Sequence, residues 1–222
     1  MVVLLVLLTV IAFLSIDWLI SRRHAPQVAL APAAVESPPV FEPVFVAGYQ
    51  LPEDRAYHRG HTWARIVGPD TVVVGMDDFA RKLTGRADSV EMPANGAWLE
   101  QGAEGFRVQH GNRIAKFLSP VAGEVVDVNP AVAANPALAT DDPYGRGWVL
   151  KIRSSGLVSN LKNLLSGSLA RRWTEDAREQ LELRLMAISG TVMQDGGTPA
   201  PDFADHLDAE EWKRLTGVFL LA

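Results

Sequence analysis

The chain has 222 residues, with 26 acidic and 21 basic side chains and a formal net charge of −5. This balance, without a basic stripe that could neutralise a phosphate backbone, argues against a nucleic-acid-binding protein. The absence of cysteine excludes a disulfide framework, thiol catalysis and a cysteine-based zinc site. An apolar content of 48% is enough to form a buried core.

The N-terminal segment has the pattern of a membrane anchor. Residues 2–20 are a mostly apolar run of nineteen residues in which Asp17 is the only charged side chain. A helix needs about 20 such residues to cross the hydrocarbon core. Arg22 and Arg23 follow the run, and positive charge stays on the cytoplasmic side. The sequence therefore predicts a single-pass transmembrane anchor in residues 1–23, contacting the membrane through residues 2–20, with a cytoplasmic body.

Two other interpretations of this segment stay open. It could be a cleaved export signal cut near Ala29-Leu30-Ala31, which would place the body outside the membrane. It could also be a buried core helix, although the run stands apart from the other predicted elements. Residues 24–52 are predicted to be a linker, because proline favours extended polyproline II structure. Its six prolines are Pro26, Pro32, Pro38, Pro39, Pro43 and Pro52.

Short strands dominate the predicted domain of residues 53–170. Extended, β-branched segments separated by turn residues favour a small sandwich or barrel. Asp77 is expected to cap a short helix that Gly85 ends. His110-Gly111-Asn112 is expected to form the tip of a hairpin, because Gly-Asn is a turn signal. The predicted strands are residues 63–67, 71–75, 106–109, 114–118, 123–128 and 148–152.

The predicted C-terminal extension, residues 171–222, changes to helical periodicity. One helix is expected to begin at Thr174 as its cap and to end at Gly190, and another to begin at Asp208 with Glu211 completing a capping box. Asp195 to Pro199 is expected to be a loop. Leucines at helical spacing precede the extension, and apolar residues form one stripe on each helix. These residues are Leu157, Leu161, Leu164 and Leu165, then Ala177, Leu181 and Leu185, and finally Trp212, Leu215 and Phe219.

Four motifs, in order, resemble the H protein of the glycine cleavage system. They cover roughly residues 57–170, and the last is the most specific. The resemblance implies a mainly β fold with C-terminal helices, a lipoyl/biotinyl-type β-sandwich (barrel-sandwich hybrid), here joined to the N-terminal transmembrane helix. The motifs are His61-Thr62-Trp63, then Val74-Gly75-Met76-Asp77-Asp78-Phe79-Ala80, then Ser119-Pro120-Val121-Ala122-Gly123-Glu124-Val125-Val126, and finally Asn135-Pro136 with Asp141-Asp142-Pro143-Tyr144-Gly145-Arg146-Gly147-Trp148.

Each motif also has a structural interpretation that is independent of the family. Trp63 and Trp148 are expected to anchor the core. Pro120 and Gly123 are expected to frame a tight turn, with glycine accepting a positive φ. His58 and His61 are expected to be structural, since the segment is extended and lacks nearby carboxylates for a metal site. Asp141 and Asp142 are expected to be turn residues.

The resemblance implies a lipoyl group, yet the sequence departs from the family where that group is attached. In the family a lysine at the hairpin tip, seven residues before the Ser-Pro serine, carries lipoate. Asn112 occupies that position here, and a side-chain amide cannot be acylated in this way. Gln109 replaces the usual acidic residue three positions earlier. Lys116, the only nearby lysine, falls inside the predicted return strand and is expected to face solvent.

Three functions remain open. The first is a membrane-anchored, non-lipoylated adaptor that holds an unidentified protein partner and carries no cofactor. The second is a genuine H protein of glycine decarboxylation, with lipoate on a non-standard lysine. The third is a membrane-fusion adaptor of an efflux pump, although those proteins extend the tip into a long helical hairpin. We find no catalytic set and no phosphate-binding glycine loop, so we do not expect an enzyme.

Overall fold

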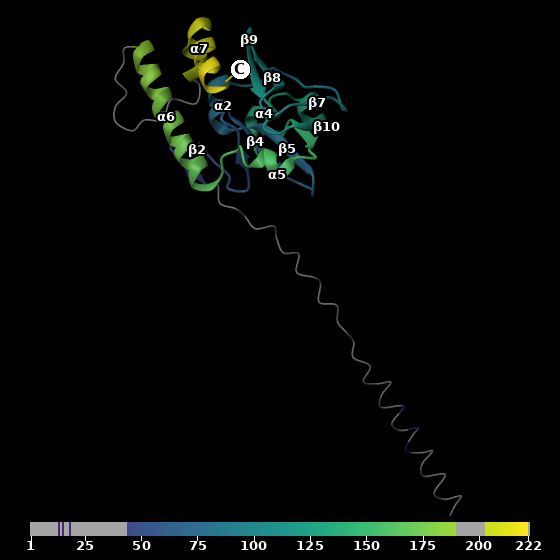
Figure 1. Cartoon of the computed structure of the whole chain (residues 1–222). Helices are drawn as coiled ribbons and strands as arrows, with labels where there is room; N and C mark the ends of the chain where they lie inside the picture. Colours follow the sequence, from purple (N-terminus) through teal and green to yellow (C-terminus); the bar gives the residue numbers. More distant parts are fainter. Residues whose placement is uncertain (1–12, 14, 16–17, 19–43, 190–202, 222) are drawn as a thin grey trace, which may run out of the picture. The chain divides into compact units, whose positions relative to one another are not determined.

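The computed structural model describes residues 13, 15, 18, 44–189 and 203–221 (Figure 1). The chain divides into two units, residues 1–42 and residues 43–222. Most of the predicted anchor and linker, and the predicted loop at residues 195–199, therefore lie outside the described residues. Among those that are described, no helix is both long enough and apolar enough to span a bilayer.

Two antiparallel sheets form the body of the second unit (Figure 1). The larger has six strands, and the smaller has three that include a long hairpin. The order in the large sheet is β3 (Ala56–Tyr57), β4 (Thr62–Ile66), β5 (Thr71–Met76), β11 (Leu150–Arg153), β10 (Gly123–Val128) and β7 (Trp98–Leu99). The order in the small sheet is β6 (Ser89–Glu91), β8 (Glu104–His110) and β9 (Arg113–Leu118).

The two sheets share one hydrophobic core. Alternating side chains of β5, β10 and β11 meet side chains from β8 and β9, as period-2 strands require. Helix α2 (Asp78–Thr84) adds its apolar face to the same cluster. The central members include Val72, Val74, Phe79, Leu83, Phe106, Val108, Phe117, Val125, Leu150 and Ile152. The mainly β sandwich-like architecture with C-terminal helices is thus confirmed.

The six predicted strands are confirmed in position, whereas β1, β2, β3, β6 and β7 were not predicted. β4, β5, β8, β9 and β10 coincide with the predicted strands to within two residues at each end. The last strand begins at Leu150, not at Trp148. Trp148 is only half-buried, packed at the edge of a second cluster with Lys151 over its ring, whereas Trp63 is fully buried as expected.

The predicted linker extends too far into the chain. Residues within 24–52 form two short paired strands, β1 (Phe45–Val46) and β2 (Tyr49–Gln50). Tyr49 and Leu51 are buried in the core clusters, so this hairpin is part of the folded unit. Tyr49 and Leu51 bury more apolar surface against the domain than an extended spacer would. The free energy gained by this burial outweighs the preference of the neighbouring prolines for extended structure.

One of the three predicted helices, α6, starts elsewhere than expected, whereas α2 and α7 follow their predicted caps. The short helices are α2, α3 (Pro130–Ala134), α4 (Leu138–Asp141), α5 (Leu157–Leu161) and η1 (Phe203–His206). Helix α6 (Gly167–Ser189) begins seven residues before Thr174, so the predicted boundary at residue 170 falls inside it. Thr174 does not cap the helix, because its hydroxyl donates to the carbonyl of Ala170 one turn earlier. Helix α7 (Ala209–Phe219) has the predicted Asp208–Glu211 capping box.

The leucine pattern before α6 is helical for one turn only. α5 ends at Leu161, and Leu164 and Leu165 lie beyond it. Leu165 instead pairs through its backbone with Tyr57. The buried faces predicted for the two long helices are confirmed, since Ala177, Leu181, Leu185, Trp212, Leu215 and Phe219 are all buried.

Two motif glycines are required by close contacts with neighbouring backbone. A Cβ on Gly123 would lie 2.2 Å from the carbonyl oxygen of Arg153, and one on Gly147 would lie 2.1 Å from that of Leu138. Gly123 does not have a positive φ, so the predicted reason for that glycine was wrong. Its role is to let β10 approach β11.

All three tyrosines of the chain are buried, which gives a prediction about alkaline pH. Burial raises the pKa of Tyr49, Tyr57 and Tyr144 above the ordinary value of about 10. Because each tyrosine has a higher pKa in the folded state than in the unfolded state, it contributes stability below about pH 10. This contribution is lost as the pH rises from there through the folded-state pKa. We expect phenolate absorbance to rise together with loss of structure by circular dichroism. Ionisation of any tyrosine before unfolding would contradict this.

Candidate functional site

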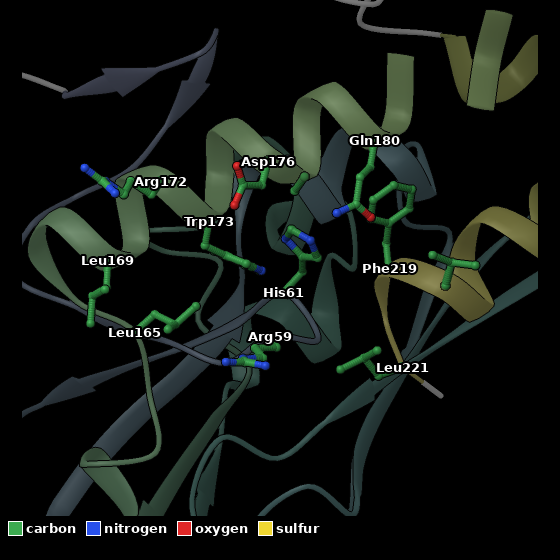
Figure 2. A pocket seen from close by; sticks show the side chains of 12 residues that line it. Arg59, His61, Leu165, Leu169, Arg172, Trp173, Asp176, Gln180, Phe219 and Leu221 are labelled. Carbon is green, nitrogen blue, oxygen red and sulfur yellow. The ribbon is translucent and has the colours of Figure 1, made fainter. Parts of the chain in front are cut away.

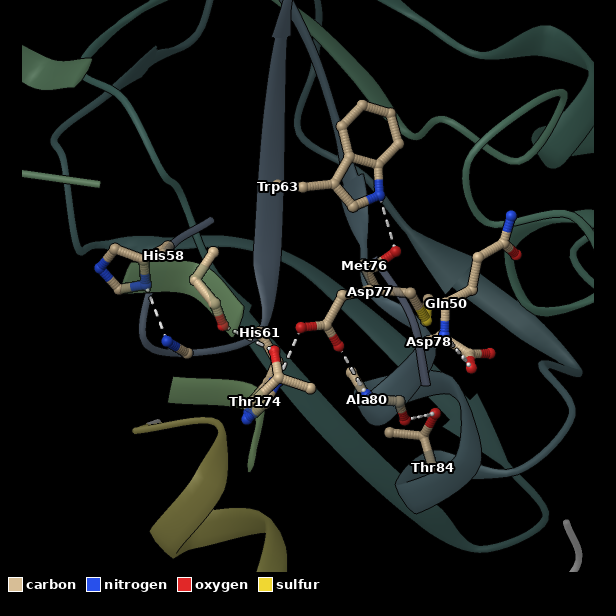
Figure 3. Close-up of polar contacts among 12 residues, drawn as sticks. Gln50, His58, His61, Trp63, Met76, Asp77, Asp78, Ala80, Thr84 and Thr174 are labelled. Carbon is tan, nitrogen blue, oxygen red and sulfur yellow. Dashed lines mark hydrogen bonds and ion pairs between the residues drawn. The ribbon is translucent and has the colours of Figure 1, made fainter. Parts of the chain in front are cut away.

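The first two motifs meet in a buried pair of side chains, His61 and Asp77 (Figure 3). His61 Nδ1 and Asp77 Oδ2 are 2.7 Å apart, with the two side chains 1% and 4% exposed. Asp77 also accepts from the backbone N–H of Ala80 at 2.8 Å, as the N-cap of α2. Its own N–H donates to the His61 carbonyl at 3.0 Å. One carboxylate thus ties the β3–β4 loop to the start of α2.

His61 is held in an aromatic setting as well. Its ring stacks on Phe79 at 4.2 Å and lies 4.4 Å from Trp173 of α6. Phe219 of α7 meets it edge-on at 6.3 Å. The residue has φ 60°, a strained conformation for a non-glycine residue. His58 has a different partner, the N–H of Gly60 at 3.0 Å, and burial lowers its pKa.

The neighbouring Asp78 contacts the last motif through Tyr144. Its carboxylate accepts from the N–H of Gln50 at 3.0 Å (Figure 3). It also accepts from Arg81 Nε at 2.7 Å. The Tyr144 hydroxyl accepts from the Asp78 N–H at 3.0 Å and donates to the Gln50 carbonyl at 2.7 Å. Asp142 is a turn residue as expected, with its carboxylate accepting from the next turn's N–H groups. These contacts also join β2 to the body of the domain.

Two further bonds complete the connection to the hairpin. Trp63 Nε1 donates to the Met76 carbonyl at 2.7 Å. The indole lies so close to the neighbouring Gly75 that a Cβ at that position would be only 2.7 Å from it. Thr62 Oγ1 donates to the Leu118 carbonyl at 2.9 Å, just before the Ser-Pro turn. The first, second and last motifs are therefore in contact at the start of α2, and Thr62 of the first motif also bonds to the residue before the third. This arrangement positions the hairpin formed by β8 and β9.

Removing the Asp77 carboxylate should destabilise the whole unit. Asp77→Ala leaves His61 buried without its partner and removes the helix cap, so we expect unfolding to become easier by about 3 kcal/mol. Chemical denaturation would measure the change. Asp127→Ala is a matched control, because its ion pair with Lys151 is 34–43% exposed and is worth less than about 1 kcal/mol. Equal losses in both variants would refute the central role of Asp77.

The hairpin tip is a two-residue turn, as the sequence predicted. His110 pairs with Arg113, and Gly111 takes φ 58° between them. Asn112 is exposed at the tip. None of these four residues carries a primary amine, so the tip does not fit the amide-linked lipoyl group that the resemblance implies.

Lys116 lies in the middle of β9, opposite Arg107. Its side chain is 50% exposed, and its Nζ is 3.3 Å from a Glu104 carboxylate oxygen. Arg107 and Lys116 together hold the pKa of Glu104 below its ordinary value. The lysine therefore faces solvent from a paired strand, as expected, four residues beyond the tip position.

The C-terminal segment contacts the tip, which the sequence did not reveal. Arg113 Nη1 donates to the Ala204 carbonyl at 2.6 Å, and Nη2 donates to the Leu207 carbonyl. His110 Nε2 lies 3.1 Å from Asp205 Oδ1. On the other side, the Gly111 N–H donates to Asp88 at 2.7 Å.

Trp212 strengthens this connection between the tip and the C-terminal segment. Its indole N–H donates to the Leu83 carbonyl at 3.0 Å, and its ring lies under the Arg113 guanidinium at 5.7 Å. Helix α7, drawn in yellow, therefore lies beside α2 and β9 (Figure 1). We use the name tip clamp for residues 203–207 together with Trp212.

Loss of the Arg113 contacts should release the tip clamp. Arg113→Gln removes charge-assisted bonds to two carbonyls, each worth about 1.5–3 kcal/mol. We expect faster amide exchange in α7, with the rest of the sheet unchanged. Arg107→Gln, on the same hairpin but 42% exposed and bound only to glutamates, is the control and should leave α7 protected. Unchanged exchange in Arg113→Gln would show that the clamp does not depend on this residue.

Within the described ranges, no group of three or more histidine or acidic side chains is placed to hold a metal ion. The candidate site therefore consists of the tip, its clamp and the His61–Asp77 pair. It can position a hairpin and present a surface, and it offers no activated nucleophile.

Comparison with known proteins agrees with the motif assignment. The family model of the glycine cleavage H-protein matches residues 55–177. A probable glycine cleavage system H protein 2 of Sulfurisphaera tokodaii is 34% identical over 128 residues, which cover 56% of this chain and 86% of the relative. The H protein of Thermus thermophilus is 39% identical over 103 residues, covering 46% and 80%. A crystal structure of the Mycobacterium marinum H protein matches 47% of this chain and 87% of its own at 30% identity, with a TM-score of 0.45.

Proposed function

Because this chain belongs to the glycine cleavage H-protein family, we propose that it is a non-lipoylated member that acts as an adaptor for a protein partner. One observation carries the proposal: the hairpin tip ends in Asn112 and is held on both sides by the chain's own side chains and carbonyls. A carrier needs a free amine on a tip that modifying enzymes can reach. In this proposal the module itself performs no catalytic step.

The partner belongs to the enzymes that recognise the family's surface. The resemblance implies a decarboxylase, an aminomethyltransferase and a lipoamide dehydrogenase as binders of an H protein. Residues 55–177 supply that surface, and the tip clamp adds a second one that lies beyond the matched part. An adaptor that binds such an enzyme without an arm would compete with a loaded H protein.

Membrane attachment is part of the same proposal. Residues 2–20 support it through their length and apolar character, and Arg22 and Arg23 support a cytoplasmic body. The adaptor would then hold its partner at the membrane surface.

A genuine H protein is the second candidate, and the family match favours it as strongly as it favours an adaptor. Lipoate would then sit on Lys116, whose Nζ would have to leave Glu104. The efflux-type adaptor has less support, because the observed tip is a two-residue turn where that class has a long helical hairpin.

Intact mass and lipoylation assays distinguish the two candidates. Purified from its native cells, the chain is expected to be unmodified and to keep residues 1–23. Incubation with a lipoate–protein ligase, ATP and lipoate should add no mass, while the Thermus thermophilus H protein serves as the loaded control. The unmodified chain should also slow glycine cleavage in a reconstituted system by competing with the loaded protein.

A lipoyl adduct on any lysine would remove the adaptor proposal and establish a carrier. An unmodified chain that leaves the cleavage rate unchanged at saturating concentration would refute this choice of partner. Loss of roughly the first thirty residues would move the domain to the outer side of the membrane.

A further inference from the structure

A cavity of about 600 Å³ opens between α6, the end of α7 and the β3–β4 loop (Figure 2). His61, Trp173 and Phe219 come together at its centre, with His61 and Phe219 buried and Trp173 half-buried. The volume lies within the range of sites that take small molecules, about 300–1,000 Å³.

The rim of the cavity is unusually apolar for a surface. Leu169 is 64% exposed, Leu221 is 52% exposed and Val218 is 37% exposed, and all three line the same hollow. Scattered exposed leucines need no explanation, but apolar side chains gathered around a concave site indicate a binding surface. An apolar ligand body would bury them together with the two aromatic rings.

Two cations stand at the same cavity. Arg59 and Arg172 line it, and neither has a carboxylate within ion-pair distance among the residues that the structure describes. Asp176 is the single acidic side chain of the lining, so the charge balance there is positive. Arginine is suited to carboxylate and phosphate groups because its planar fork donates two parallel bonds.

The His61 ring adds a polar atom directed away from Asp77. Nδ1 is bonded to Asp77, and the two ring nitrogens point in nearly opposite directions. Within the described part of the chain, Nε2 has no hydrogen-bond partner. Only 1% of the His61 side chain is exposed, so the ring forms part of the cavity floor.

We propose that this cavity binds a small molecule with one anionic head, a carboxylate or a phosphate monoester, and a compact apolar body. Arg59 holds the head, and His61, Trp173, Phe219 and the rim leucines cover the body. Phe219, Val218 and Leu221 lie beyond the family-matched residues 55–177, so part of the wall comes from the segment that the family model does not cover. The site goes beyond the adaptor function and does not depend on it.

Ligand-detected NMR on the full chain tests the site with three probes. Phenylbutyrate supplies a carboxylate and an aromatic body, phenylbutyramide removes the charge, and butyrate removes most of the body. We expect saturable binding of phenylbutyrate, and binding of the other two weakened severalfold. Arg59→Gln should weaken phenylbutyrate about fivefold, the size of one partly exposed ion pair, and leave phenylbutyramide unchanged.

The matched control is Arg153→Gln, which removes a 55% exposed arginine on β11 that pairs with Asp70 away from the cavity. It should leave all three affinities unchanged. Leu169→Ser, at the exposed rim, should weaken phenylbutyrate and phenylbutyramide alike. Absence of saturable phenylbutyrate binding, equal affinity for the amide, or equal weakening by both arginine variants would each overturn the proposal.

Discussion

The rest of the structure depends on the buried hydrogen bond between His61 and Asp77. A carboxylate without its partner at this depth would be strongly unfavourable, so the β3–β4 loop, α2 and strands β4 and β5 between them must assemble together. The aromatic rings of Phe79, Trp173 and Phe219 then close around the imidazole, which brings α6 and α7 into the same cluster. Three of the four motifs thus meet at or beside this pair, through His61, Asp77 and the Asp78–Tyr144 bond.

That centre also explains why the fold persists where the attachment residue of the family is absent. The polar bonds around Asp77 and Asp78 hold the sheets and the hairpin, and none of them involves Asn112. Fold and tip chemistry are therefore physically separable in this protein. Arg113, by contrast, bonds to the C-terminal segment. These bonds fix the tip in place, which favours a binding surface over the attachment point of a swinging arm.

Local signals in the sequence were enough for the six longer strands, the hairpin tip and two of the helix caps, but not for the two- and three-residue strands β1, β2, β3, β6 and β7. The caps of Asp77 and Asp208 were predictable because a cap satisfies backbone donors within three residues. The start of α6 was not, since Thr174 bonds inside the helix as well as it could cap one. The contact between Arg113 and the tip clamp could not be predicted from the sequence. Its acceptors are backbone carbonyls, which have no sequence signature, and they lie 91 and 94 residues from Arg113.

That separation has a consequence for the order of synthesis. The hairpin leaves the ribosome before residues 203–207 exist, and 91 residues must be added between Arg113 and Ala204. At about 5–20 residues per second, this interval is roughly 5–20 seconds. During translation Arg113 and His110 therefore lack their C-terminal partners, and an enzyme that acts at the tip meets these two side chains uncovered only on the nascent chain. This period of access ends when residues 203–207 have been synthesised and have bonded to Arg113.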